Sequence, residues 1–117
     1  MPNFTKQATE LMKELGIRPN IKGYKYIMYA IELSETNRDI TDRMITLYVT
    51  IAEKFNDNYR RVERAIRHAV ESAWNIGNTE VQDELFRYTI NPDKGKPTNS
   101  EFIATIVEHL YIQQEVE

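Results

Sequence analysis

Apolar residues recur along most of the chain at spacings of three and four positions, the period of an α-helix that buries one face. We expect six such helices, over residues 5–15, 22–33, about 41–55 and 59–76, and from residues 79 and 98 onwards. No segment alternates apolar and polar residues at period two, as a half-buried strand does. The pattern therefore predicts an all-α fold of about six helices.

Turn-forming residues mark several of the predicted helix ends. Gly16 follows the first helix, residues 56–58 follow the third, and Gly77 follows the fourth. Residues 34–39 and 91–97 are polar or rich in glycine and proline, so both are expected to be loops. The tail after Ile112 should fray, because it carries few apolar residues.

Helix starts are indicated by residues that can cap backbone N–H groups. Asp39 or Thr41 is the expected N-cap of the third helix. A reciprocal capping box requires a hydroxyl residue followed three positions later by Glu or Gln. Two pairs have this spacing and predict the starts of the last two helices: Thr79 with Gln82, and Thr98 with Glu101.

The same period predicts which side chains are buried. The second helix should bury Tyr24, Ile27, Met28 and Ile31, and the third Met44, Ile45, Tyr48, Ile51, Ala52 and Phe55. The fourth helix has the longest apolar stripe, made of Val62, Ala65, Ile66, Ala69, Val70, Ala73 and Trp74.

Composition is that of one globular domain over residues 1–117, since 41% of the residues are hydrophobic and 28% are charged. The absence of cysteine excludes disulfides, cysteine-ligated zinc and cysteine nucleophiles, and it suits a reducing cytoplasm. No apolar run approaches the roughly 18 residues of a membrane span, and no signal peptide is recognisable. We therefore expect a cytoplasmic protein without membrane contact.

The distribution of charge matters more than the net charge of −3. Residues 60–68 hold four arginines and one glutamate, a local charge of +3 that leaves −6 for the rest of the chain. A basic patch on an acidic body suits a protein that binds DNA at one surface and repels it elsewhere. A solvated helix face that happens to carry arginines is the alternative interpretation.

Enzymatic chemistry has little support in the sequence. His68 and His109 have no metal-binding spacing, the carboxylates are scattered over solvent faces, and four glycines do not form a phosphate loop. We expect no catalytic residues, no metal and no cofactor, and hence no enzyme.

The third and fourth predicted helices have the features of a helix-turn-helix. Small Ala52 allows a close crossing, and apolar residues such as Ile51 and Val62 would hold it. The second helix of such a motif presents polar residues to the major groove, where arginine can pair with guanine and glutamate with cytosine. The candidates are Asn58, Tyr59, Arg60, Arg61, Glu63, Arg64 and Arg67. A generic helical hairpin would give the same pattern.

The stretch RVERAIRHAVESAW, residues 61–74, resembles the recognition helix of the effector domain of the sporulation master response regulator of endospore-forming bacteria. Other segments resemble the same domain in the same order along nearly the whole chain: residues 15–17, 21–24, 51–56, 86–89 and 94–104. The resemblance implies six helices, binding to short promoter boxes in double-stranded DNA, frequent head-to-tail dimers on tandem boxes, and contact with an RNA polymerase sigma factor.

The resemblance also implies roles for individual residues. Arg61, Glu63 and Arg64 match the family's base-contacting positions. Arg67 and His68 lie on the same predicted face, where we expect phosphate contacts together with Asn58, Tyr59 and Arg60. The surface that would contact a sigma factor comprises Thr79, Glu80, Val81, Asp83 and Phe86.

This chain also departs from the family pattern. Tyr59 and Arg60 add an aromatic ring and a charge where the family has small residues, so we expect a different target sequence. No segment resembles the family's receiver domain. The leading hypothesis is a sequence-specific transcriptional regulator. The alternative is an interaction module on the same fold that binds a sigma factor or a full-length regulator without reading DNA.

Overall fold

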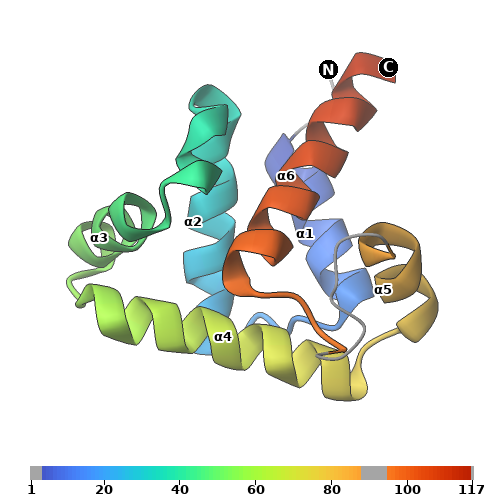
Figure 1. Ribbon diagram of the computed structural model, residues 1–117, viewed down its shortest axis with the longest axis horizontal. Helices are drawn as coiled ribbons and strands as arrows, with labels where there is room; N and C mark the ends of the chain where they lie inside the picture. The colour runs from blue at the N-terminus through green and yellow to red at the C-terminus, as the bar shows by residue number, and fades with distance from the viewer. Residues whose placement is uncertain (1–3, 88–94, 117) are drawn as a thin grey trace.

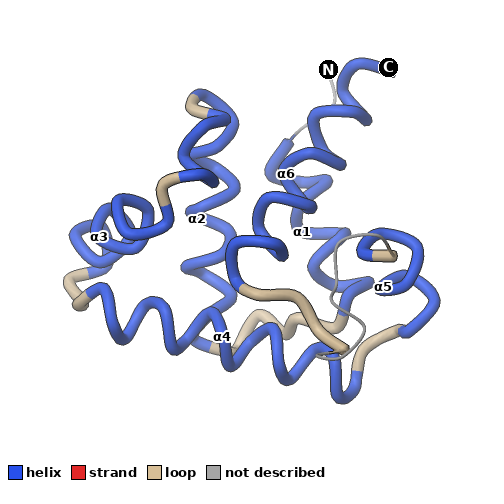
Figure 2. Tube along the Cα trace, in the orientation of Figure 1, coloured by secondary structure: helices blue, strands red, loops and turns tan. Residues whose placement is uncertain are grey.

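The computed structural model describes residues 4–87 and 95–116, and in these residues it holds six α-helices and a short 3-10 helix, with no strand (Figures 1 and 2). The all-α prediction is confirmed, and the arrangement is compatible with a helix-turn-helix. The elements in chain order are α1 (Phe4–Leu15), α2 (Lys22–Thr36), η1 (Arg38–Asp42), α3 (Met44–Phe55), α4 (Tyr59–Ile76), α5 (Thr79–Phe86) and α6 (Asn99–Val116).

Helix α4 lies across one end of the domain and packs against several of the other helices (Figure 1). It crosses beneath the first turns of α2 and α6 and the last turn of α1, while α3 lies beside its N-terminal half. The buried stripe of α4 faces these helices: Val62, Ile66, Ala69, Val70 and Ala73. Full burial of each larger aliphatic side chain stabilises the fold by about 1.5–3 kcal/mol, so this stripe fixes which face of α4 remains in solvent.

Aromatic rings fill the space between α4, α5 and α6. The ring of Trp74 meets those of Phe86 and Phe102 edge-on, with centroids 5.1 and 5.9 Å apart, and Phe86 stacks on Phe102 at 5.6 Å. These separations are typical of favourable aromatic pairs. The cluster joins the C-terminal half of α4 to the two last helices.

Gly23 allows α2 to approach α4 closely. A Cβ at this position would collide with the backbone carbonyl oxygen of Ala65 and would lie 2.9 Å from the Cβ of Ala69. Only glycine fits at this position. The crossing that it allows places the first turn of α2 against the middle of α4.

Most of the predicted helix ends are confirmed. Gly16 ends α1 at φ 91° and Asn56 ends α3 at φ 54°, both in the left-handed region that suits glycine and asparagine. Helix α4 has the predicted bounds. The second capping box is also confirmed: Thr98 N–H donates to Glu101 Oε1 at 2.8 Å, and Glu101 N–H donates to Thr98 Oγ1 at 3.1 Å.

The capping box predicted at Thr79 and Gln82 is wrong. The N-cap of α5 is Asn78, whose side-chain oxygen accepts from the N–H groups of Glu80 and Val81. The Gln82 side chain is buried instead, where its Nε2 donates to the carbonyl oxygens of Leu15 at 3.2 Å and Ala73 at 2.8 Å. These carbonyls belong to the last turns of α1 and α4, which need donors from outside their own helices.

The connection between the second and third helices also differs from its prediction. Helix α2 continues past residue 33 to Thr36, and in this extension Ser34 is buried and donates to the Ile31 carbonyl. Residues 38–42, predicted in part as loop, form η1, and neither Asp39 nor Thr41 is the N-cap of α3, which is Arg43. Helix α6 runs to Val116, so the predicted fraying after Ile112 is wrong.

Several burial predictions need correction. Ile45 is 71% exposed, and Leu47 is buried in its place. In α2 the buried residues include Tyr26 and Ala30, whereas Tyr24 and Met28 are only half-buried. Of the predicted loop at 91–97, residues 91–94 lie outside the described residues.

Candidate nucleic-acid interface

The turn between α3 and α4 sets where α4 begins. Asn56 leaves α3 in a left-handed conformation, and Asn58 has an extended backbone, as an N-cap does. The Asn58 side-chain oxygen accepts from the Arg61 N–H at 2.9 Å. This oxygen therefore serves the helix start, and only the amide nitrogen of Asn58 is left for a phosphate.

Asp57 anchors the turn, and its role was not anticipated from the sequence. Its side chain is only 7% exposed. It accepts hydrogen bonds from the Tyr26 hydroxyl and from the Asn58 N–H, and it lies 3.1 Å from Lys22 Nζ and 3.9 Å from Arg61 Nη1. The carboxylate thus links the start of α2 to the start of α4.

These contacts shift two pKa values. The hydrogen bond from Tyr26, then that from Asn58 N–H and the nearby Lys22, lower the pKa of Asp57 to about 2. Desolvation, followed by the same hydrogen bond, raises the pKa of Tyr26 to about 12. Both shifts favour the charged carboxylate and the neutral phenol, which are the forms that make this hydrogen bond.

Asp57 should therefore stabilise the fold at neutral pH and make that stability depend on pH in the acid range. Its pKa is lower in the folded chain than the ordinary 3.8, so the stabilisation is complete above that value and is lost as the pH falls towards 2. Urea unfolding of Asp57→Asn should show lower stability than the unmodified chain at neutral pH and a smaller loss between pH 4 and pH 2. Asp83→Asn, at an exposed site on α5, is the control. An identical acid response in both variants would contradict the role of Asp57.

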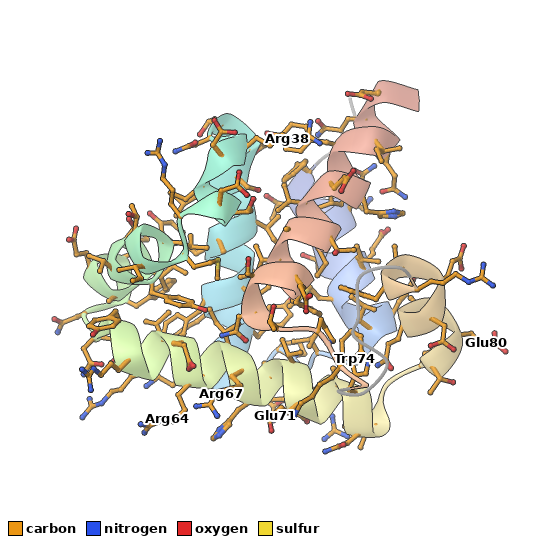
Figure 3. The ribbon with its side chains drawn as sticks, in the orientation of Figure 1. Arg38, Arg64, Arg67, Glu71, Trp74 and Glu80 are labelled. Atoms are coloured by element: carbon orange, nitrogen blue, oxygen red, sulfur yellow. The ribbon has the colours of Figure 1, made fainter. Side chains whose placement is uncertain are left out.

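The exposed face of α4 carries the predicted reading residues. Arg61, Arg64, Arg67 and His68 are all exposed. Arg64 and Arg67 point away from the body of the domain along the free side of α4 (Figure 3). Within the described part of the chain Arg64 takes part in no ion pair, so its guanidinium is available to a ligand.

Glu63 lies at the edge of this face, and both its side chain and its backbone carbonyl have partners. Its carboxylate pairs with Arg67 one turn later, with Arg67 Nε 3.3 Å from Glu63 Oε1. Its backbone carbonyl accepts from Asn99 Nδ2 at 3.1 Å, which also contacts the Tyr48 hydroxyl at 3.0 Å. Arg67, for which a phosphate contact was predicted, therefore also orients the Glu63 carboxylate.

Two elements flank the exposed face. On one side, the first turn of α2 brings Lys22 to a pocket of about 340 Å³ that is also lined by Arg61, Arg64 and His68. On the other side, Tyr59 and Arg60 begin α4 next to α3, and Arg60 Nε donates to the Tyr59 hydroxyl at 3.3 Å. The sequence alone does not place Lys22 beside α4, because that position depends on the crossing at Gly23.

The surface predicted for sigma-factor contact is only partly accessible. Thr79, Glu80 and Asp83 are exposed on α5, and Val81 is half-buried. Phe86 is fully buried against Trp74 and Phe102, so its side chain is not part of this surface. Figure 3 shows Glu80 at the opposite end of the domain from Arg64, so a partner on α5 would leave the reading face open.

Two further observations concern other kinds of site. None of the described helices is long and apolar enough to cross a membrane. In the described ranges, no three histidine, aspartate or glutamate side chains gather as metal ligands would.

The family resemblance is supported by a comparison with protein-family models. The model described as "Sporulation initiation factor Spo0A C terminal" matches residues 8–110, from the first turns of α1 to the last third of α6. This is a family of DNA-binding effector domains in transcription regulation and sporulation, and not of enzymes. Because the match covers nearly the whole chain, the protein belongs to the family of the C-terminal domain of sporulation initiation factor Spo0A.

Proposed function

We propose that this protein is a transcriptional regulator that reads a short sequence of double-stranded promoter DNA with α4 in the major groove. The observation that carries the proposal is that α4 has one buried apolar face and one exposed basic face. One face is buried against α2, α3 and α6, while the opposite face presents Arg61, Arg64 and His68 to solvent just after a tight turn. A rigid helix with exposed arginines in its first turns is what major-groove reading requires.

The exposed residues divide into readers and positioning contacts. Arg61 and Arg64 each donate to the O6 and N7 of a guanine, and Glu63 accepts from the N4 of a cytosine. Phosphates on either side are bound by Arg67, His68, Arg60, Tyr59 and the amide of Asn58. Lys22 adds a phosphate contact from α2.

The proposal extends to two further properties that the family resemblance implies. The domain binds adjacent promoter boxes as a head-to-tail dimer, and it contacts a sigma factor through Thr79, Glu80, Val81 and Asp83. Such a regulator acts in the cytoplasm, where bacterial promoters are. Occupation of two boxes should be cooperative, whereas one domain on one box should bind weakly, because the acidic remainder of the chain limits the number of phosphates it can neutralise.

Arg64→Ala should weaken binding to the preferred duplex by about 1–3 kcal/mol and relax the base preference at one position, because a bidentate base contact is lost. Selection from a random duplex pool, followed by gel-shift titration, measures both effects. Arg38→Ala is the matched control, since Arg38 lies at the end of the domain opposite α4 (Figure 3). If the Arg64 variant selected the same sequence as the unmodified chain, Arg64 would not be a reader.

Salt titration tests the phosphate contacts independently. The affinity should fall steeply with salt because neutralised phosphates release counterions. Binding that does not depend on salt would contradict phosphate docking. Absence of binding to every duplex, together with tight binding to a sigma factor, would instead favour the interaction module.

A further inference from the structure

Three large apolar side chains lie exposed together beside the reading face: Ile45, Val49 and Tyr59, which we call the apolar flank. Ile45 is 71% exposed, Tyr59 42% and Val49 38%. Of the large hydrophobic side chains exposed in the described residues, the remaining two lie elsewhere: Ile76 is at the other end of α4 from Tyr59, and Ile112 is on α6. A cluster of this kind on a small domain indicates a binding surface.

The apolar flank is continuous with the arginines of α4. Ile45 and Tyr59 line an open pocket of about 320 Å³ together with Arg60, Arg64 and Arg67. Val49 and Tyr59 line the adjoining hollow at the α3–α4 turn. The Tyr59 ring therefore connects both depressions, and its position is held by Arg60, whose guanidinium carbon lies 5.7 Å from the ring centre.

A partner for this surface must offer apolar groups next to negative charge. In the major groove, the C5-methyl group of thymine is the apolar feature of the base edges, and phosphates border it on both sides. Another protein seated on the apolar flank would also cover Arg60 and Arg64, and so would exclude DNA from the reading face. Charge and continuity thus favour DNA over a protein partner.

We propose that the apolar flank contacts thymine methyl groups at the border of the sequence read by α4, so that Ile45 and Tyr59 are specificity determinants. This inference rests on the proposed function. It assigns to α3, through Ile45, a direct part in sequence preference, and it gives Tyr59 an apolar contact with a base in addition to any contact with a phosphate.

Replacement of thymine by deoxyuridine tests the inference, because it removes only the methyl group and keeps base pairing and charge. The preferred duplex from the random pool is prepared with thymine and with deoxyuridine throughout, and the ratio of the two affinities is measured. The unmodified chain should bind the deoxyuridine duplex about fourfold more weakly for each methyl that it contacts. Ile45→Ser and Tyr59→Ser should bring this ratio closer to one, because they bind the thymine duplex less tightly.

Ile112→Ser, at an exposed apolar site on α6, is the control and should keep the ratio of the unmodified chain. Ile45, Tyr59 and Ile112 are all exposed, so thermal melting should show that the three variants are folded. Equal affinities of the unmodified chain for both duplexes, or an unchanged ratio in the flank variants, would overturn the inference while leaving DNA binding intact. Self-association that only the flank variants lose in sedimentation would instead assign the flank to a second copy. If no duplex binds at all, the proposed function fails and the inference fails with it.

Discussion

Val62→Asp is expected to unfold the domain at ordinary temperature. Val62 is completely buried in the first turn of α4, in the stripe that faces the other helices. Burial of a carboxylate without a partner costs several kcal/mol, and a domain of this size has only about 5–15 kcal/mol of stability in total. Circular dichroism during heating should show either no cooperative transition or a strongly lowered melting temperature.

The matched control for this change is Asn75→Asp, which places a carboxylate on an exposed position of the same helix. It should leave the melting temperature nearly unchanged. An unaltered melting temperature in the Val62 variant would mean that the buried face of α4 is assigned wrongly. The assignment of Arg61 and Arg64 to the reading face would then be wrong as well, because the two faces are opposite sides of one helix.

Gly23→Ala is expected to destabilise the fold and weaken DNA binding, although alanine favours helices. Helix propensity alone would stabilise the variant by about 1 kcal/mol. The new Cβ, however, collides with the backbone carbonyl of Ala65, which cannot move without moving α4. Overpacking of this kind typically costs about 1–3 kcal/mol and sometimes more, so steric repulsion should outweigh propensity.

The consequence for function follows from what α2 carries. Lys22 and Tyr26 both contact Asp57, so a displaced α2 also loosens the turn that starts α4. Urea unfolding and gel-shift titration should therefore both report a loss. Thr36→Ala, at an exposed position of α2, isolates the effect of propensity and should be neutral or slightly stabilising. A more stable Gly23 variant would show that the close crossing is not required.

Local signals in the sequence were enough to predict helix α4 and its exposed arginines. The asparagines around Asp57 prefer turn and N-cap conformations, Gly77 follows the last turn, and the apolar stripe has one unambiguous period. The capping box of Thr98 and Glu101 was predictable for the same reason, because its partners are three residues apart. Family membership was also recognisable from residues 61–74 and the segments that accompany them in order.

Tertiary contacts decided what the local pattern could not. Gln82 has the spacing of a capping residue, yet it is buried because α1 and α4 both end beside it with carbonyls that need donors. Ile45 shares a helix face with Ala52, yet Ala52 is buried whereas Ile45 is exposed, because the neighbouring helices cover only part of that face.

From the sequence alone, Asp57 is a turn residue. Its partners Tyr26 and Lys22 are more than 30 positions away in the chain, and only the packing of α2 brings them to it. The helical period of apolar residues indicates which residues share a face, and the spacing of capping residues indicates where helices begin. Only the packing of distant helices determines which of those faces are covered and which polar groups find a partner, because burial and hydrogen bonding depend on neighbours that are far apart in the chain.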